Sequence, residues 1–186
     1  MTPWVILDRD GVINAESDHF IKNLDEWRPL PGSIDAIARL CRAGFRVAVA
    51  TNQSGVGRGL IAPEALAAMH RELEHLVVAA GGQIAGIFCC PHVPEDGCDC
   101  RKPRPGLLQS IATQFAIELV GIPAIGDSLR DLEAAVAVGC APILVRTGNG
   151  VATEYALTSH PDTRLHDIVV LDDLAAAADL LISKQP

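Results

Sequence analysis

With 186 residues, 49% of them hydrophobic and 20% charged, the chain has the composition of a globular protein large enough to bury a core. Its formal net charge of −8 argues against a general nucleic-acid binder, which needs a basic surface. Because the N-terminal stretch lacks the basic start and long apolar run of a signal peptide, we expect a cytoplasmic protein. We expect no membrane span either, since Gly81 and Gly82 break the most apolar stretch.

The first predicted element is a short apolar strand from residue 4 that runs into Asp8 and Asp10. Side chains two residues apart on a strand point the same way, so both carboxylates should face one spot at the carboxyl edge of a sheet. Open α/β folds bind ligands at that edge. Two like charges this close need a cation or a proton between them, and Mg²⁺, which one or two carboxylates hold beside a substrate phosphate, is the natural occupant. The alternative is an ordinary strand-to-turn junction, because Asp and Gly favour turns.

A polar loop is predicted for residues 15–31, and from there helices and strands alternate to the end of the chain. Ser33 should cap the first helix, which ends at Gly44. The predicted helices are 33–43, 63–80, 106–118, 129–138, 151–157 and 172–182, and the further strands are 45–50, 84–89, 121–125, 140–145 and 167–171.

This alternation predicts a three-layer, Rossmann-like α/β fold, in which a parallel sheet carries helices on both faces. We expect a single domain over residues 1–186. The interval from Asp10 to Thr51 has room for one loop and one helix, so no cap domain is expected. The site should therefore be open, with selectivity arising from loops 16–21, 53–59 and 90–104.

The strand ends carry side chains suited to phosphoryl transfer. In a parallel sheet these ends share one edge, which would bring together Asp8, Asp10, Thr51, Lys102 and Asp127. We assign Asp8 as the nucleophile because it stands at the rigid strand tip. Asp10, placed further out, would protonate the leaving oxygen and later take a proton from water. Thr51 and Lys102 would stabilise the phosphate oxygens.

A loop rich in Pro, Asp and Gly places three cysteines close to a histidine. Cys90, His92, Cys98 and Cys100 form the ligand set of a closed tetrahedral zinc site, which would be structural. Six cysteines in a cytoplasmic chain also favour metal binding over disulfides. Because Cys100 stands two residues before Lys102, zinc would fix that lysine. The alternative is that these cysteines are small buried hydrophobic residues.

Four segments of the chain resemble the motifs of the haloacid dehalogenase superfamily of phosphatases, in order and over nearly the whole sequence. They are Asp8-Arg9-Asp10-Gly11, Thr51-Asn52-Gln53, Arg101-Lys102-Pro103 and Gly126-Asp127. The resemblance implies Mg²⁺ on Asp8, on the Asp10 carbonyl and on Asp127. It also implies phosphate contacts from Thr51, Asn52 and Lys102.

Within the superfamily, residues 51–55 and the Cys/His loop are similar to those of phosphatases that act on heptose bisphosphates. That likeness implies release of the 7-phosphate from a heptose 1,7-bisphosphate through an aspartyl-phosphate, in the cytoplasmic synthesis of ADP-heptose and the lipopolysaccharide core. The chain departs from the pattern in two ways. Ser128 follows Asp127 where relatives often carry a basic residue, and the metal loop is short, as in histidinol-phosphate phosphatase domains.

Candidate substrate contacts come from the segments around the motifs: Arg9, Asp18, His19, Asn52, Gln53, Ser54, Arg58 and Arg101. A cluster of arginines (Arg9, Arg58, Arg101 and Arg104) favours a doubly anionic substrate, hence a phosphorylated sugar over histidinol phosphate. Glu16 and Asp18 weaken that argument, because they suit an amine as well.

Two further alternatives are considered. A polynucleotide 3′-phosphatase needs an aromatic-lined basic groove, which 4% aromatic residues and the net charge disfavour. A non-catalytic, zinc-stabilised binding module should have lost a catalytic acid, and none is missing. We expect a monomer. His70 and His75 are expected on a solvated helix face, and Asp131 either behind the metal or at a helix N-terminus.

Overall fold

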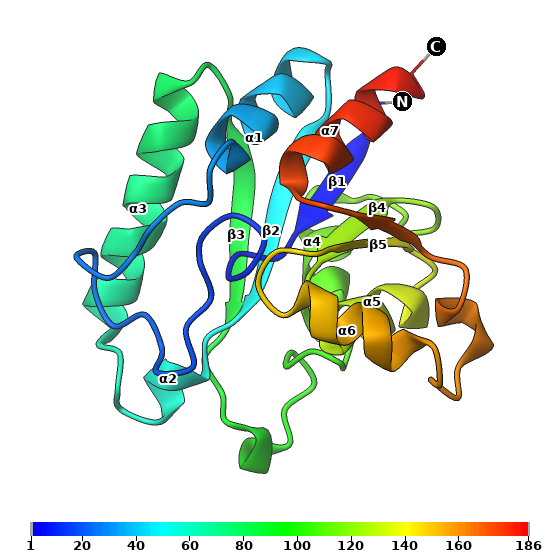
Figure 1. Cartoon of the computed structure of the whole chain (residues 1–186). Helices are drawn as coiled ribbons and strands as arrows, with labels where there is room; N and C mark the ends of the chain where they lie inside the picture. Colours follow the sequence, from blue (N-terminus) through cyan, green and yellow to red (C-terminus); the bar gives the residue numbers. More distant parts are fainter. Residues whose placement is uncertain (1, 186) are drawn as a thin grey trace.

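The computed structural model describes residues 2–185, which form one sheet of six parallel strands between helices. The strand order is β3-β2-β1-β4-β5-β6 (Figure 1). The strands are β1 (Trp4–Leu7), β2 (Arg46–Asn52), β3 (Ile84–Cys90), β4 (Pro123–Gly126), β5 (Ala141–Val145) and β6 (Val169–Leu171). The predicted parallel α/β sheet is confirmed.

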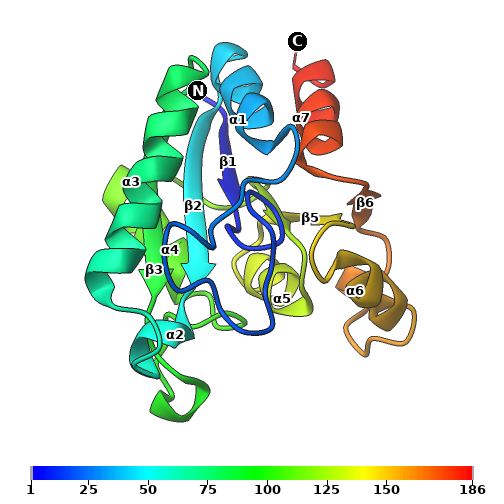
Figure 2. The same ribbon diagram turned by 60° about the vertical axis from the view of Figure 1, so that its left-hand side comes forward.

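Helices cover both faces of the sheet, as Figures 1 and 2 show. The helices are α1 (Ser33–Arg42), α2 (Ser54–Gly57), α3 (Pro63–Ala79), α4 (Gly106–Phe115), α5 (Leu129–Ala137), α6 (Gly150–Leu157) and α7 (Leu174–Ser183). The core on one face packs α1, α3 and α7 against the strands, and the core on the other face packs α4 and α5. The alternating inward residues of β1 divide between them, with Val5 and Leu7 on one side and Trp4 and Ile6 on the other.

Several element ends differ from the sequence-based expectation. The expected cap at Ser33 is wrong, because Gly32 is the N-cap of α1 and the Ser33 hydroxyl donates to the carbonyls of Ile13 and Leu30. Helix α4 ends at Phe115, three residues early, where Ala116 turns the chain at φ 51°. The glycine-rich loop after β2 contains the short helix α2, which was not predicted.

The loop of residues 15–31 is closed at its base. The Ala15 N–H donates to the Arg28 carbonyl, and the Leu30 N–H donates to the Ile13 carbonyl. Ile21 and Trp27 bury their side chains in the core below the loop. The loop is therefore anchored at both ends and in its middle, which fixes its place beside the carboxyl ends of β1 and β2.

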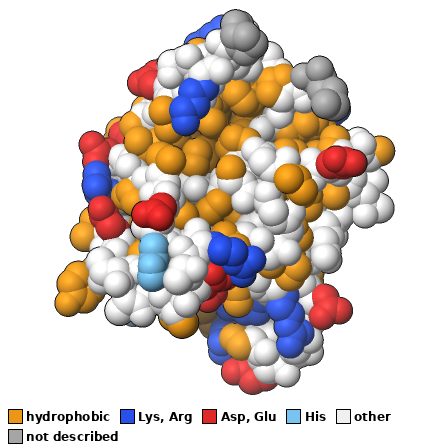
Figure 3. All heavy atoms as spheres, turned by 90° about the vertical axis from the view of Figure 1, so that its right-hand side faces the viewer, with side chains coloured by type: hydrophobic (Ala, Val, Ile, Leu, Met, Phe, Trp, Pro, Cys, Tyr) orange, Lys and Arg blue, Asp and Glu red, His pale blue; other side chains and the backbone are white. Residues whose placement is uncertain are grey.

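The edge strand β6 lies on the side of the molecule that Figure 3 faces, where hydrophobic side chains are prominent among scattered charged groups. Three residues form the strand, from Val169 to Leu171. A short edge strand offers few free backbone groups for pairing with another chain.

No helix within residues 2–185 combines the length and the apolar character needed to span a membrane.

Candidate active site

The site lies where the three central strands end. Asp8 directly follows β1, Thr51 is the penultimate residue of β2, and Asp127 directly follows β4. The Asp8 N–H donates to the Ile125 carbonyl at 2.9 Å, which continues the pairing of β1 with β4 to the strand tip. Parallel pairing therefore brings these side chains to one edge of the sheet, as expected from the sequence.

Lys102 reaches this edge from the loop after β3 and is 3% exposed. Its ammonium lies 2.9 Å from Asp8 Oδ1 and 2.6 Å from Asp131 Oδ1, and it donates to the Ala50 carbonyl at 2.8 Å. Burial opposes the charge, but the carboxylates of Asp131 and Asp8 hold the pKa of Lys102 above its usual range. The lysine is therefore a fixed positive charge beside Asp8.

Asp8, Asp127 and Asp131 form a cluster of acids whose oxygen atoms lie within 4.8 Å of one another. Burial, followed by the charge of Asp131, raises the pKa of Asp8 well above its ordinary value and that of Asp127 to about 7. Lys102 balances one of these three charges. A divalent cation at these oxygens would restore full ionisation, so the cluster fits Mg²⁺.

Asp131, expected either behind the metal or at a helix N-terminus, lies in the first turn of α5 and contacts Lys102. Its Oδ2 accepts hydrogen bonds from the N–H and hydroxyl of Ser128 at 3.0 and 2.6 Å, which forms a capping box at the start of α5. Against the effect of burial, Lys102 and then Ser128 lower the pKa of Asp131. In the sequence, the spacing Ser128-x-x-Asp131 was the signal that Asp131 belongs to a helix start. The same spacing explains why a serine stands at position 128, because Ser128 is the N-cap of α5.

Asp10 is held by side chains from three directions. The Arg9 guanidinium donates to both of its oxygens, Gln53 Nε2 donates to Oδ2 at 2.7 Å, and Asn14 Nδ2 donates to Oδ1 at 2.8 Å. Gln53 also donates to the Thr51 hydroxyl at 2.9 Å. These hydrogen bonds to both oxygens hold the Asp10 carboxylate in one direction.

Asn52, expected to contact phosphate, pairs instead with the main chain of Lys102. Its Nδ2 donates to the Lys102 carbonyl at 3.0 Å and its Oδ1 accepts from the Lys102 N–H at 3.1 Å. This amide pair ties the end of β2 to the loop after β3. The phosphate contact of Asn52 stays a prediction, while its support of Lys102 is visible.

An open cleft lies over these groups. Of the expected substrate contacts, Arg9, Asn52, Gln53, Ser54 and Arg101 line it. Glu16 and Arg130 are among the further residues that line it without having been assigned as contacts. No sequence pattern singled out Arg130. It lines the cleft because α5 begins beside it.

Several expected contacts lie elsewhere. Asp18, His19 and Arg58 are exposed and do not line the cleft within the described part of the chain. Arg104 binds the carbonyls of Gly97 and Cys98 in the metal loop.

The expected arginine cluster was therefore wrong for two of its four members, Arg58 and Arg104. Arg101 and Arg9 both line the cleft together with Arg130, but Arg9 is 1% exposed and its guanidinium donates to Asp10. The expectation that His70 lies on a solvated face was also wrong, because it is half-buried with Nε2 3.3 Å from Arg9 Nη1.

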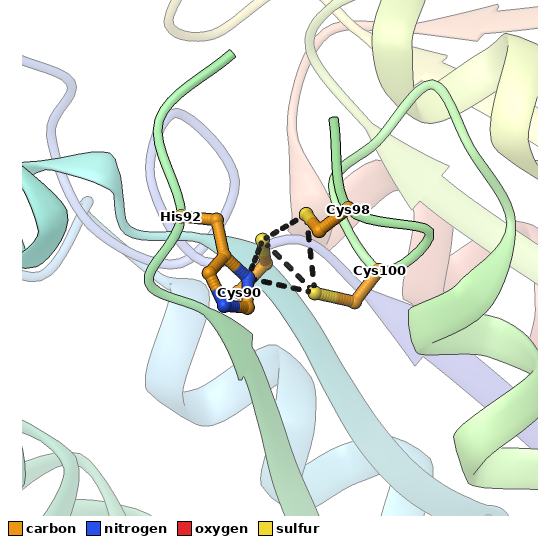
Figure 4. Close-up of side chains that lie close together, drawn as sticks. All are labelled: Cys90, His92, Cys98 and Cys100. Carbon is orange, nitrogen blue, oxygen red and sulfur yellow. Dashed lines mark hydrogen bonds between the residues drawn. The ribbon is translucent and has the colours of Figure 1, made fainter. Parts of the chain in front are cut away.

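The Cys/His loop forms a second possible metal centre (Figure 4). The sulfur atoms of Cys90, Cys98 and Cys100 lie 3.2 to 3.6 Å apart, and His92 Nδ1 lies 3.2 Å from Cys100 Sγ and 3.6 Å from Cys90 Sγ. A tetrahedral zinc site with Zn–S bonds of about 2.3 Å has edges of about 3.8 Å. The four side chains thus converge at close to the separation that zinc needs.

Comparison with protein families and solved structures gave consistent matches. The HAD-hydrolase-like family model matches residues 99–177. The D-glycero-β-D-manno-heptose-1,7-bisphosphate 7-phosphatase of Pseudomonas aeruginosa is 54% identical over 178 residues, which are 96% of this chain and 97% of that protein. The enzyme of the same name from Bordetella bronchiseptica is 50% identical, over 97% of this chain and 98% of the relative.

A solved structure of D,D-heptose 1,7-bisphosphate phosphatase from B. bronchiseptica, complexed with magnesium and phosphate, superimposes with a TM-score of 0.92. It is 49% identical and covers 98% of this chain and 99% of its own. The corresponding enzyme from Burkholderia thailandensis is 43% identical, with a TM-score of 0.73 and the same coverage.

Proposed function

Because the chain belongs to the haloacid dehalogenase-like hydrolases, in the family of the heptose-bisphosphate phosphatases compared above, we propose that it removes the 7-phosphate of D-glycero-β-D-manno-heptose 1,7-bisphosphate. The observation that carries this proposal is the pairing of Asp8 with Lys102 at 2.9 Å under a cleft that Arg101 and Arg130 line. A carboxylate next to a fixed cation suits attack on a phosphate, and two further cations suit a second phosphate.

In the proposed reaction, a carboxylate oxygen of Asp8 attacks the phosphorus of the 7-phosphate, and the bond from phosphorus to the sugar oxygen breaks. Asp10 gives its proton to that oxygen, which leaves as the free hydroxyl. Asp10 then takes a proton from a water molecule, which attacks the phosphorus, releases phosphate and regenerates Asp8. Lys102 neutralises the charge on the phosphate oxygens throughout.

Magnesium suits the acid cluster, because buried Asp8 and Asp127 have raised pKa values and only one lysine balances them. We propose that Asp8, Asp127 and the Asp10 carbonyl hold it, with Asp131 supporting Lys102. When bound, Mg²⁺ would supply positive charge that keeps Asp8 ionised and helps to orient the phosphate of the substrate.

We propose that Cys90, His92, Cys98 and Cys100 hold zinc in a purely structural role. All four positions of a tetrahedral ion would be filled, so none remains for a substrate. The Arg101 guanidinium donates to the His92 carbonyl at 3.3 Å, and Lys102 follows directly. Zinc would thus fix two residues of the cleft through the loop that carries them.

The test is phosphate release from D-glycero-β-D-manno-heptose 1,7-bisphosphate and, in parallel, from histidinol phosphate, with Mg²⁺ present. We expect a clear preference for the sugar, and ³¹P spectra should show that the anomeric phosphate remains on the product. Asp8→Asn should abolish release, because an amide oxygen is a poor nucleophile. Undiminished activity of Asp8→Asn, equal rates on both substrates, or loss of the anomeric phosphate would contradict the proposal.

A further inference from the structure

Arg9 joins Asp10 to a histidine from a distant part of the chain. Its guanidinium directs Nε and Nη2 to the Asp10 carboxylate, at distances of 2.9 to 3.1 Å. The remaining nitrogen, Nη1, lies 3.3 Å from Nε2 of His70 on α3. The arginine is 1% exposed, so water does not replace these partners. The planar guanidinium of Arg9 is therefore held between the Asp10 carboxylate and the His70 imidazole.

The imidazole must accept the hydrogen bond in this contact, because a guanidinium has donors only. Nε2 can accept only when it carries no proton, so the His70 ring is neutral. In agreement, burial and then the charge of Arg9 lower the pKa of His70 to about 4. A neutral ring at this place orients the guanidinium without adding a charge that would repel it.

We propose that His70 is a positioning residue, which holds the Arg9 guanidinium in the plane that fixes Asp10 for proton transfer to the leaving oxygen. This inference rests on the proposed function, since it assigns His70 to the proton donor of that reaction. His70 does not line the cleft within residues 2–185, so it acts only through Arg9. Without it, Arg9 Nη1 would be a buried donor lacking its acceptor, and the guanidinium would be held by Asp10 alone, with its plane less restricted.

The test compares two leaving groups in wild type, His70→Leu and His70→Gln. An alkyl leaving group, as in the heptose bisphosphate, needs a proton as it departs, whereas 4-nitrophenolate leaves 4-nitrophenyl phosphate as a stable anion. We expect His70→Leu to lower kcat for the sugar by about tenfold, because small misplacements of a catalytic group have effects of that order. KM for the sugar, and kcat for 4-nitrophenyl phosphate, should change less than about twofold.

His70→Gln keeps an acceptor at a similar reach, so it should restore most of the kcat for the sugar. The matched control is His75→Leu on the same helix, where the side chain is 74% exposed and the kinetics should not change. Equal losses on both substrates, no loss in His70→Leu, or no rescue by His70→Gln would overturn the inference. Asp8→Asn separates the two proposals: if it stays active the proposed function fails, and if it is inactive only the role of His70 is at stake.

Discussion

At the scale of single residues, two glycines determine how closely the backbone surrounds Asp127. Gly11 has φ +78° and Gly148 has φ +58°, and a Cβ atom on either would lie 2.0 or 2.2 Å from Asp127 Oδ2. The next residue, Asn149, donates its N–H to the same oxygen at 2.7 Å. Only a residue without a side chain fits at these two positions, so they shape the proposed magnesium site.

We predict that Gly148→Ala weakens Mg²⁺ binding, because its Cβ would displace the Asp127 carboxylate. The matched control is Gly44→Ala, which has φ +90° but open space around its Cβ. Gly44→Ala should lower the free energy of unfolding in urea by roughly 1–2 kcal/mol, which is the cost of the left-handed conformation. Gly148→Ala should lower it further, because its Cβ also meets the Asp127 carboxylate. Only Gly148→Ala should need more Mg²⁺ for half-maximal activity. The same Mg²⁺ requirement in both variants would contradict this explanation.

At the scale of elements, the segment between β3 and α4 carries Arg101 and Lys102 on little regular structure. It contains one short 3₁₀ helix, Pro94–Asp96, and its other contacts are mainly polar, such as Arg104 Nη1 donating to the Cys98 carbonyl at 2.9 Å. Such a segment has few apolar contacts to hold it in place. The Cys/His cluster and the amide pair of Asn52 with Lys102 are among the contacts that order it.

We predict that Cys100→Ser removes bound zinc and lowers kcat by roughly ten- to a hundredfold, because the loop that carries Lys102 loses one of its supports. Far-UV circular dichroism should still show the α/β core, since Cys100 lies in the loop after β3 and only Cys90 of the cluster belongs to the sheet. Cys41→Ser is the control: Cys41 contacts the Gln83 carbonyl, away from the loop, and its replacement should keep zinc and activity. Metal analysis of the purified proteins measures the zinc, and wild-type turnover in zinc-free Cys100→Ser would contradict the proposed role.

At the scale of the whole molecule, the parallel sheet concentrates buried acids at one edge, which couples stability to pH and metal. Without metal, the pKa of Asp127 is raised to about 7 and that of Asp8 is also raised, so the folded protein binds more protons than the unfolded chain. Between pH 4 and about pH 7 the metal-free protein should therefore lose stability as the pH rises. Below that range these groups are protonated in both states.

We predict that the gain in Tm from Mg²⁺ is larger at pH 8 than at pH 5, because the ion offsets repulsion among ionised carboxylates. Thermal unfolding with Mg²⁺ and with chelator, at several pH values, measures the effect, and a difference of several degrees is expected. Asp127→Asn removes the group with the pKa of about 7, so the pH dependence of the metal-free protein should flatten. A gain that does not vary with pH would contradict this account.

The sequence by itself determined the sheet, the order of its elements and the residues at the strand ends. Apolar strands that end in Asp8, Thr51 and Asp127 are local patterns, and parallel pairing brings their ends to one edge whatever the details of packing. The spacing of Cys90, His92, Cys98 and Cys100 is likewise a local pattern, and the four side chains converge in the structure.

Only the tertiary structure decided which partner each buried polar group takes. Arg9 turns inward to Asp10 and His70, Asn52 bonds to the main chain of Lys102, and Asp131 pairs with Lys102. These partners lie up to 61 residues apart, and no local pattern encodes their meeting. The physical reason is that a buried charge or amide must be satisfied by whatever group the packed elements bring within reach, which depends on the whole fold.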